Sequence, residues 1–135
     1  MQDSTFTKII KGEIPCYKVY EDAKTFAFLS INPIQPGQVV LVPKKQVAHV
    51  WDLADDDYRA LMAAAKKIAL KIRQAFPDKS HVAMHIEGLE VTHAHLKLFP
   101  FSTDEEFCHH PDMNAEPDHA TLAAVAEKLR LEDEL

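Results

Sequence analysis

The spacing of apolar and polar residues along the chain predicts three helices. The longest covers residues 56–75, where apolar side chains recur every three or four positions and basic residues occupy the opposite face. Asp55 or Asp56 is expected to cap the start of this helix. The same periodicity predicts a short helical turn over residues 5–12 and a second amphipathic helix over residues 118–131.

Five further runs follow the pattern of β-strands and are bounded by prolines, glycines or turn-sized polar segments. They cover residues 16–21, 25–29, 39–43, 81–87 and 91–99. Strands in sequence, one long helix and a helical tail predict an α+β fold, in which one long helix packs on an antiparallel sheet of about five strands. We expect a domain over residues 1–102 and a C-terminal helical extension over residues 103–135 that packs on or near it.

The predicted strand over residues 91–99 carries the most unusual side chains. Alternation along a strand would place His93, His95 and Lys97 on one face, about 6.6 Å apart, with small or apolar residues on the other. Imidazole can act as nucleophile, base or acid near neutral pH. A neighbouring ammonium group favours a bound phosphate. The row of side chains therefore predicts a chemical site.

Two other interpretations of these histidines remain open from the pattern alone. They could be exposed residues on an edge strand. They could also be two ligands of a metal ion, with His85 or the cluster Cys108-His109-His110 supplying a third ligand. That cluster is itself interpreted as part of an exposed tail before Pro111.

Composition and charge narrow the classes of molecule that the protein is expected to bind and the compartment in which it is expected to occur. The formal net charge is −6 and no basic stripe is present, which argues against a DNA partner or an anionic membrane surface. No apolar run reaches the roughly 18–20 residues of a membrane span, and the N-terminus lacks a secretory core. Cys16 and Cys108 are far apart, which suits a reducing compartment. We expect a cytoplasmic protein.

Two charged segments are interpreted as solvated. Lys44 and Lys45 follow the third predicted strand, where they could attract an anionic ligand, but a solvent-exposed turn is the preferred interpretation. The terminal Glu-Asp-Glu-Leu is interpreted as a solvated helix end.

Around the two histidines the sequence resembles the histidine triad family, whose signature is His-φ-His-φ-His-φ-φ with φ apolar. Here the motif reads His93-Ala-His-Leu-Lys-Leu-Phe99. Collinear matches extend the resemblance over about residues 4–101, and they include Phe6-Thr-Lys-Ile-Ile-Lys-Gly-Glu-Ile-Pro15 and Val42-Pro-Lys-Lys45. The resemblance implies an α+β fold, a homodimer whose long helices pair, and a pocket for a purine nucleotide or nucleotide conjugate, without a cofactor.

The resemblance also implies roles for individual residues. Family members hydrolyse or transfer nucleotides from phosphoramidates or dinucleoside polyphosphates, through a covalent nucleotidyl-histidine formed on the middle histidine. By position that nucleophile is His95, and His93 would support the phosphate site or hold the surrounding network in place. The positions that match the family's base and ribose contacts are Phe6, Ile9, Phe28 and Ile31, for which core packing is the alternative.

Several positions depart from the family pattern. Lys97 replaces the third histidine; it can hold a phosphate, but its ordinary pKa makes it a poor base at neutral pH. Ser30 stands where many members place an aspartate for the ribose. Leu89 and Glu90 stand where members often offer a glutamine and a small hydroxyl residue to the phosphate; Glu90 would repel it.

A further departure lies near the N-terminus, where Ser4 and Thr7 stand in place of the Cys-x-x-Cys pair that binds zinc in some members, so no structural zinc is expected. Taken with the changes around the phosphate site, these differences leave two main hypotheses, beside the lesser alternative of a metalloprotein that uses His93 and His95. The chain is an enzyme of the histidine triad type, or it is a catalytically weak nucleotide-binding or interaction protein with the same fold.

Overall fold

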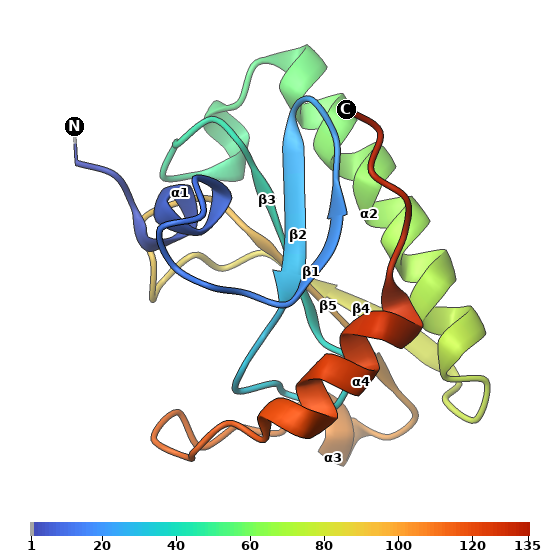
Figure 1. Cartoon of the computed structure of the whole chain (residues 1–135). Helices are drawn as coiled ribbons and strands as arrows, with labels where there is room; N and C mark the ends of the chain where they lie inside the picture. The colour runs from blue at the N-terminus through green and yellow to red at the C-terminus, as the bar shows by residue number, and fades with distance from the viewer. Residues whose placement is uncertain (1) are drawn as a thin grey trace.

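The computed structural model describes residues 2–135 and contains a five-stranded antiparallel sheet (Figure 1). Its strands are β1 (Lys18–Glu21), β2 (Thr25–Leu29), β3 (Val39–Pro43), β4 (His81–His85) and β5 (Leu96–Phe101). Their order across the sheet is β1-β2-β3-β5-β4, and every neighbouring pair is antiparallel. The α+β fold predicted from the sequence is confirmed.

The helices are α1 (Thr5–Ile10), the 3-10 turn η1 (Val50–Asp52), α2 (Asp55–Ala75), α3 (Asp104–Phe107) and α4 (His119–Leu129). The long helix is found where the periodicity predicted it, but its predicted cap is wrong. Ala54 occupies the N-cap position and offers no side-chain hydrogen bond. Asp55 and Asp56 lie inside the first turn, where their charges favour the positive end of the helix dipole.

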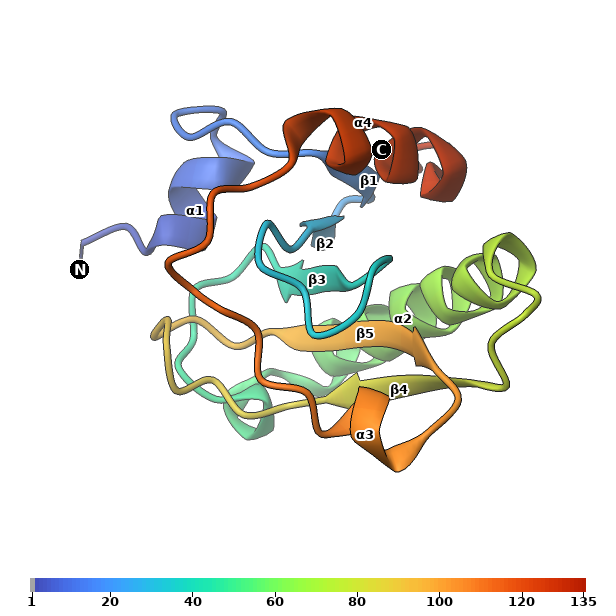
Figure 2. The same ribbon diagram turned by 90° about the horizontal axis from the view of Figure 1, so that it is seen from below.

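One face of the sheet is closed by α2 and α4. Alternate residues of β3 and β5, including Leu41, Leu96 and Leu98, pack there against Leu61 and Ile68 of α2 in the larger apolar core. The opposite face is covered only in part, by α1, and Figure 2 shows α1 and α2 on opposite sides of the sheet. The two faces therefore differ in how completely helices cover them.

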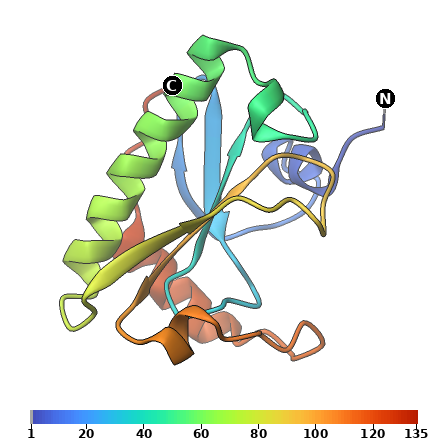
Figure 3. The ribbon, with the colours of Figure 1, turned by 180° about the vertical axis from the view of Figure 1, so that it is seen from behind.

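The strand predicted over residues 91–99 is wrong in its first half. β5 begins at Leu96, and the predicted strand over 81–87 ends at His85, so residues 86–95 form a loop between β4 and β5. Within this loop the amide of His93 donates to the carbonyl of Val91 (2.8 Å), which is a tight bend rather than a strand. Figure 3 shows the loop lying beside α1.

The last four residues are exposed, as the sequence suggested, but they lie beyond the end of α4 and the C-terminal segment runs along β1. The amide of Leu131 donates to the carbonyl of Val19 (2.9 Å), and the amide of Glu134 donates to the carbonyl of Glu21 (2.8 Å). The carboxylate of Glu134 also accepts from the hydroxyl of Tyr20 (2.7 Å). Because β1 is an edge strand with unpaired backbone groups, the returning tail satisfies them.

Lys44 and Lys45 lie in a turn after β3, as predicted, but both are ion-paired. Nζ of Lys44 lies 2.7 Å from the carboxylate of Glu21, and Nζ of Lys45 lies 2.8 Å from that of Asp57. These contacts tie the turn to β1 and to the start of α2. Among residues 2–135, no helix combines the length and the apolarity that are needed to cross a bilayer.

Candidate active site

His93 lies in the loop between β4 and β5 and is completely buried. Its Nε2 lies 2.8 Å from the carbonyl oxygen of Pro43, the last residue of β3, and its Nδ1 lies 2.6 Å from Oγ of Ser4. A carbonyl oxygen can only accept, so Nε2 carries the proton in the neutral ring. Nδ1 then accepts from the Ser4 hydroxyl. Both ring nitrogens are engaged inside the protein.

His95 is held by the same loop but in a different way. Its Nδ1 lies 2.8 Å from the backbone carbonyl oxygen of His93, so Nδ1 donates and Nε2 keeps its lone pair. Among the hydrogen bonds of residues 2–135, none involves Nε2 of His95. The ring lines the main cavity of the protein. His95 therefore presents a neutral nitrogen with a free electron pair to that cavity.

Burial keeps both rings neutral at physiological pH. Loss of hydration lowers the pKa of His93 and of His95 below the ordinary value of 6.5, and their hydrogen bonds to carbonyl groups oppose this only in part. The phenyl ring of Phe6 stands edge-on to both imidazoles, with centroids 5.7 Å from His93 and 4.9 Å from His95. α1 thus supplies the apolar surroundings that lower both pKa values.

The cavity in front of His95 has a volume of about 570 Å³ and lies over the open face of the sheet, next to α1. This volume falls in the range of small-molecule sites. The residues predicted as pocket lining from the sequence all border it: they are Phe6, Ile9, Phe28, Ser30 and Ile31. The first three are also buried in the smaller apolar core, so the pocket and core interpretations both apply to them.

Lys97 borders the cavity beside His95, but two carboxylates already surround its charge. Its Nζ lies 2.7 Å from Oε1 of Glu87 and 3.9 Å from Oε2 of Glu90, and its side chain is only 12% exposed. The hydrogen bond from Lys97 lowers the pKa of Glu87. Glu87 and Glu90 both line the cavity, whereas Leu89 is 86% exposed and does not.

One wall of the cavity comes from the segment after β5, which the sequence placed in an exposed tail. Phe107, the Cys108-His109-His110 cluster and Met113 line the cavity. Nδ2 of Asn32 donates to the carbonyl of Asp112 (3.2 Å), which ties this segment to the loop after β2. In Figure 2 the segment runs from α3 past the sheet towards α1. Sequence reasoning missed this wall because no local pattern indicates such a return.

The structure also bears on the two alternative interpretations of the histidines. The edge-strand interpretation is wrong, because His93 and His95 are both buried and neither lies in a strand. Within residues 2–135 no three or more His, Cys, Asp or Glu side chains are grouped so that they could hold a metal ion. Both ring nitrogens of His93 are hydrogen-bonded, so neither is free to bind a metal ion. Ser4, which stands in place of a cysteine of the zinc-binding pair, is one of the two partners of His93.

Comparison with known proteins identifies the family and the fold. The HIT domain model matches residues 11–103. A HIT-like protein of Methanocaldococcus jannaschii is 35% identical over 98 residues, covering 70% of this chain and 76% of its own length. Adenosine 5'-monophosphoramidase hnt1 of Schizosaccharomyces pombe is 32% identical over 103 residues, covering 74% of this chain and 75% of its own length.

A solved structure shows the same likeness over nearly the whole chain. The crystal structure of a HIT-like protein involved in cell-cycle regulation, from Bartonella henselae, superposes with a TM-score of 0.82 and 26% identity. It covers 95% of this chain and 94% of its own. The fold, the motif around His93 and His95 and the match over residues 11–103 agree, and the chain belongs to the HIT family.

Proposed function

We propose that the chain is a hydrolase or nucleotidyl transferase, and that it acts at the α-phosphate of a nucleoside phosphoramidate or a dinucleoside polyphosphate-like compound. The observation that carries the proposal is the free Nε2 of His95, held in one tautomer by the carbonyl of His93 and open to the cavity. The similarity to the fission yeast monophosphoramidase supports the same class of substrate.

The proposed chemistry has two steps. First, the lone pair of Nε2 of His95 attacks the α-phosphorus; the Nε2–P bond forms, and the bond from phosphorus to the leaving nitrogen or oxygen breaks. The leaving atom takes the electron pair and a proton from solvent. A water molecule or an acceptor hydroxyl then attacks phosphorus and gives up its proton to solvent. The Nε2–P bond breaks, its electron pair returns to Nε2, and the neutral ring is restored.

The cavity supports the binding of a nucleotide. Phe6, Ile9, Phe28 and Ile31 offer apolar surface on which a purine ring can pack, and Ser30 offers a hydroxyl to the ribose. Lys97 offers one cation for a phosphate oxygen, once that cation turns from Glu87. The role assigned to His93 is structural support, because it lies behind His95 and does not line the cavity.

The test is turnover of adenosine and guanosine 5'-phosphoramidates by the wild type and by His95→Ala. We expect His95→Ala to lose about a thousandfold or more in kcat, because the nucleophile itself is removed. In the wild type, a rapid acid quench followed by mass spectrometry should detect a nucleotide adduct on the peptide that contains His95. The adduct should be absent from His95→Ala.

A matched control is His49→Ala, because His49 is exposed and makes no side-chain cap to η1. It should turn over like the wild type. Equal turnover in the wild type and His95→Ala would end the proposal, as would an adduct on a different residue.

A second candidate is a nucleotide-binding protein with little turnover, which is favoured by the contacts of Lys97. Its cation is shared between Glu87 and Glu90, so an incoming phosphate must compete with two carboxylates. Lys97→His separates the candidates. A gain of about tenfold or more in turnover would show that the scaffold is competent and that the lysine slows it. If calorimetry detects nucleotide binding but neither the wild type nor Lys97→His turns over the substrate, the second candidate is favoured.

A further inference from the structure

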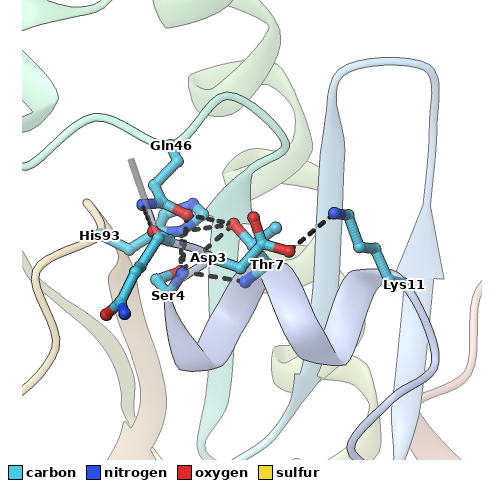
Figure 4. A network of polar contacts seen from close by, with 7 residues as sticks. Asp3, Ser4, Thr7, Lys11, Gln46 and His93 are labelled. Carbon is cyan, nitrogen blue, oxygen red and sulfur yellow. Dashed lines mark hydrogen bonds and ion pairs between the residues drawn. The ribbon is translucent and has the colours of Figure 1, made fainter.

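Helix α1 and its N-cap residue contact the loop between β4 and β5 (residues 86–95) through polar side chains as well as through Phe6. Ser4 caps this helix: its Oγ accepts from the amide of Thr7 (3.0 Å). The same oxygen lies 2.6 Å from Nδ1 of His93, 89 positions away in the sequence. Figure 4 shows Ser4, Thr7 and Gln46 gathered against one edge of the His93 ring. A helix cap and a histidine of the motif thus share one hydroxyl group.

The Ser4 hydroxyl has two acceptors within reach, Nδ1 of His93 (2.6 Å) and Oγ1 of Thr7 (3.2 Å), and the contact to His93 is the shorter. Oε1 of Gln46 accepts from the amide of Ser4 (2.7 Å) and from the hydroxyl of Thr7 (2.7 Å). The Thr7 proton is therefore committed to Gln46, and Thr7 lies at 3.5 Å from the His93 ring. The Ser4 hydroxyl is left to donate to Nδ1 of His93.

This donation agrees with the tautomer of His93 that the carbonyl of Pro43 requires. With Nδ1 accepting from Ser4, the proton must lie on Nε2, where it donates to the carbonyl of Pro43 (2.8 Å). These two bonds hold the ring and its backbone in place. The backbone carbonyl of His93 then accepts from Nδ1 of His95 (2.8 Å), which leaves the other nitrogen of His95 free. The chain of contacts runs from α1 to the proposed nucleophile.

We propose that Ser4 is a positioning residue for the reaction at His95, and that Thr7 and Gln46 hold its hydroxyl in the donating orientation. This inference rests on the proposed function, in which His95 is the nucleophile. Without the Ser4 hydroxyl, Nδ1 of His93 loses its donor. The ring then keeps a single strong anchor, the bond from Nε2 to the carbonyl of Pro43, and it can turn about that bond. The carbonyl that orients His95 is no longer held in place.

The test compares Ser4→Ala, Ser4→Thr and the wild type. Partners that orient a functional histidine from behind are typically worth about 10- to 100-fold, so Ser4→Ala should lower kcat by that factor while KM changes little. Nitrogen-15 NMR of the imidazole rings should show His93 and His95 each in a single tautomer in the wild type. In Ser4→Ala the Nδ1 signal of His93 should move because it loses its donor, and the His95 signals should shift because the carbonyl that orients this ring is displaced. Ser4→Thr keeps the hydroxyl and should restore both the signals and kcat.

The matched control is Lys11→Ala, which lies at the end of the same helix. Lys11 makes only an exposed ion pair with Asp3 (2.7 Å), also seen in Figure 4. It should keep wild-type kcat and wild-type ring signals. A fall in kcat of the same size in Lys11→Ala would mean that any disturbance of α1 slows the reaction, and it would overturn the assignment to Ser4.

Two further outcomes decide the proposal. Wild-type kcat and unchanged His95 ring signals in Ser4→Ala would overturn it. If Ser4→Ala does not fold, Thr7→Val decides: it keeps the Ser4 hydroxyl but removes the contact from Thr7 to Gln46. Unchanged ring signals and kcat in Thr7→Val would then count against this chain of contacts, and shifted signals of His93 and His95 with a lower kcat would support it. The ring signals need no substrate, so they test the chain of contacts even if the wild type turns over no phosphoramidate.

Discussion

The two faces of the sheet share the same strands but carry different side chains. In β5, Leu96 and Leu98 point to the face that α2 and α4 close, whereas Lys97 and Phe99 lie on the face that α1 covers in part. The closed face is a continuous apolar core. The open face holds the cavity, two carboxylates and the ring of His95. One strand thus serves stability with one set of residues and chemistry with the other.

The comparison shows why the open face can hold polar groups. Polar groups are costly to bury unless they are hydrogen-bonded, and each buried imidazole has such a partner: Pro43 and Ser4 for His93, and a backbone carbonyl for His95. The closed face places no functional demand on its residues. Its packing therefore carries most of the stability, and substitutions on the two faces should have different consequences.

The largest predicted effect on stability is on the closed face. Leu98→Ala removes a buried side chain next to α2 and should lower the free energy of unfolding by about 3 kcal/mol. Ile9→Ala on the open face should cost less than half as much, because Ile9 already borders the cavity. Its main effect should be weaker nucleotide binding. Urea unfolding and calorimetry measure the two quantities. Equal losses of stability would contradict the difference between the faces.

The second prediction concerns pH and follows from the buried rings of the open face. The pKa values of His93 and His95 lie below 6.5 in the folded protein, so the unfolded chain binds more protons as the pH falls through 6.5. The stability that these rings contribute is complete above that pH and is lost as the pH falls through the folded pKa values. kcat should fall in the same direction, by about tenfold per pH unit once His95 is protonated, because protonated Nε2 has no lone pair.

Measurements from about pH 5 to pH 8 would check both parts of this prediction. Urea unfolding reports the free energy, and initial rates with a phosphoramidate report kcat. A free energy of unfolding that rises as the pH falls from 7 towards 5.5 would contradict the sign that burial of the rings requires.

The smallest predicted effect concerns the wall of the cavity that comes from the C-terminal extension. Asn32→Ala removes the side-chain contacts to the carbonyls of Asp112 and Ala115, both at exposed positions. The free energy of unfolding should change by about 0.5 kcal/mol or less, because these bonds compete with water. KM should rise about two- to threefold, because the wall from Phe107 to Met113 is held less firmly. An unchanged KM would mean that this wall does not touch the substrate.

Much of the fold could be predicted from local patterns, and the reasons differ between elements. The 21 residues of α2 have a clear apolar period, and the tight hairpin of β1 and β2 is separated by a turn-sized segment. The first half of the strand over residues 91–99 could not be predicted, because His93 and His95 follow a two-residue alternation without being in a strand. Their spacing comes from a bend that is held by contacts to Pro43, Val47 and Ser4.

Several residues of the candidate site were predicted from the sequence, but the way in which they are arranged around the cavity was not. His95, Lys97 and the apolar pocket residues were identified by the motif and its family resemblance, and all of them line the cavity. Glu87 and the segment that ends at Met113 were missed, because each is brought to the cavity by the path of the chain rather than by a local pattern. The contact between Ser4 and His93 joins residues 89 positions apart, a separation that no periodicity reports.

By itself the sequence determined the α+β class, the long helix and the hairpin of the first two strands, because these follow from short-range periodicity and turn chemistry. The family resemblance, and not periodicity, indicated His95 as the candidate nucleophile. Only the tertiary structure decided which nitrogen of that ring is free, which groups surround Lys97 and which segments enclose the cavity. The physical reason is that a tautomer, an ion pair and a cavity wall each depend on the distance between atoms that are far apart in the sequence. That distance is set by packing.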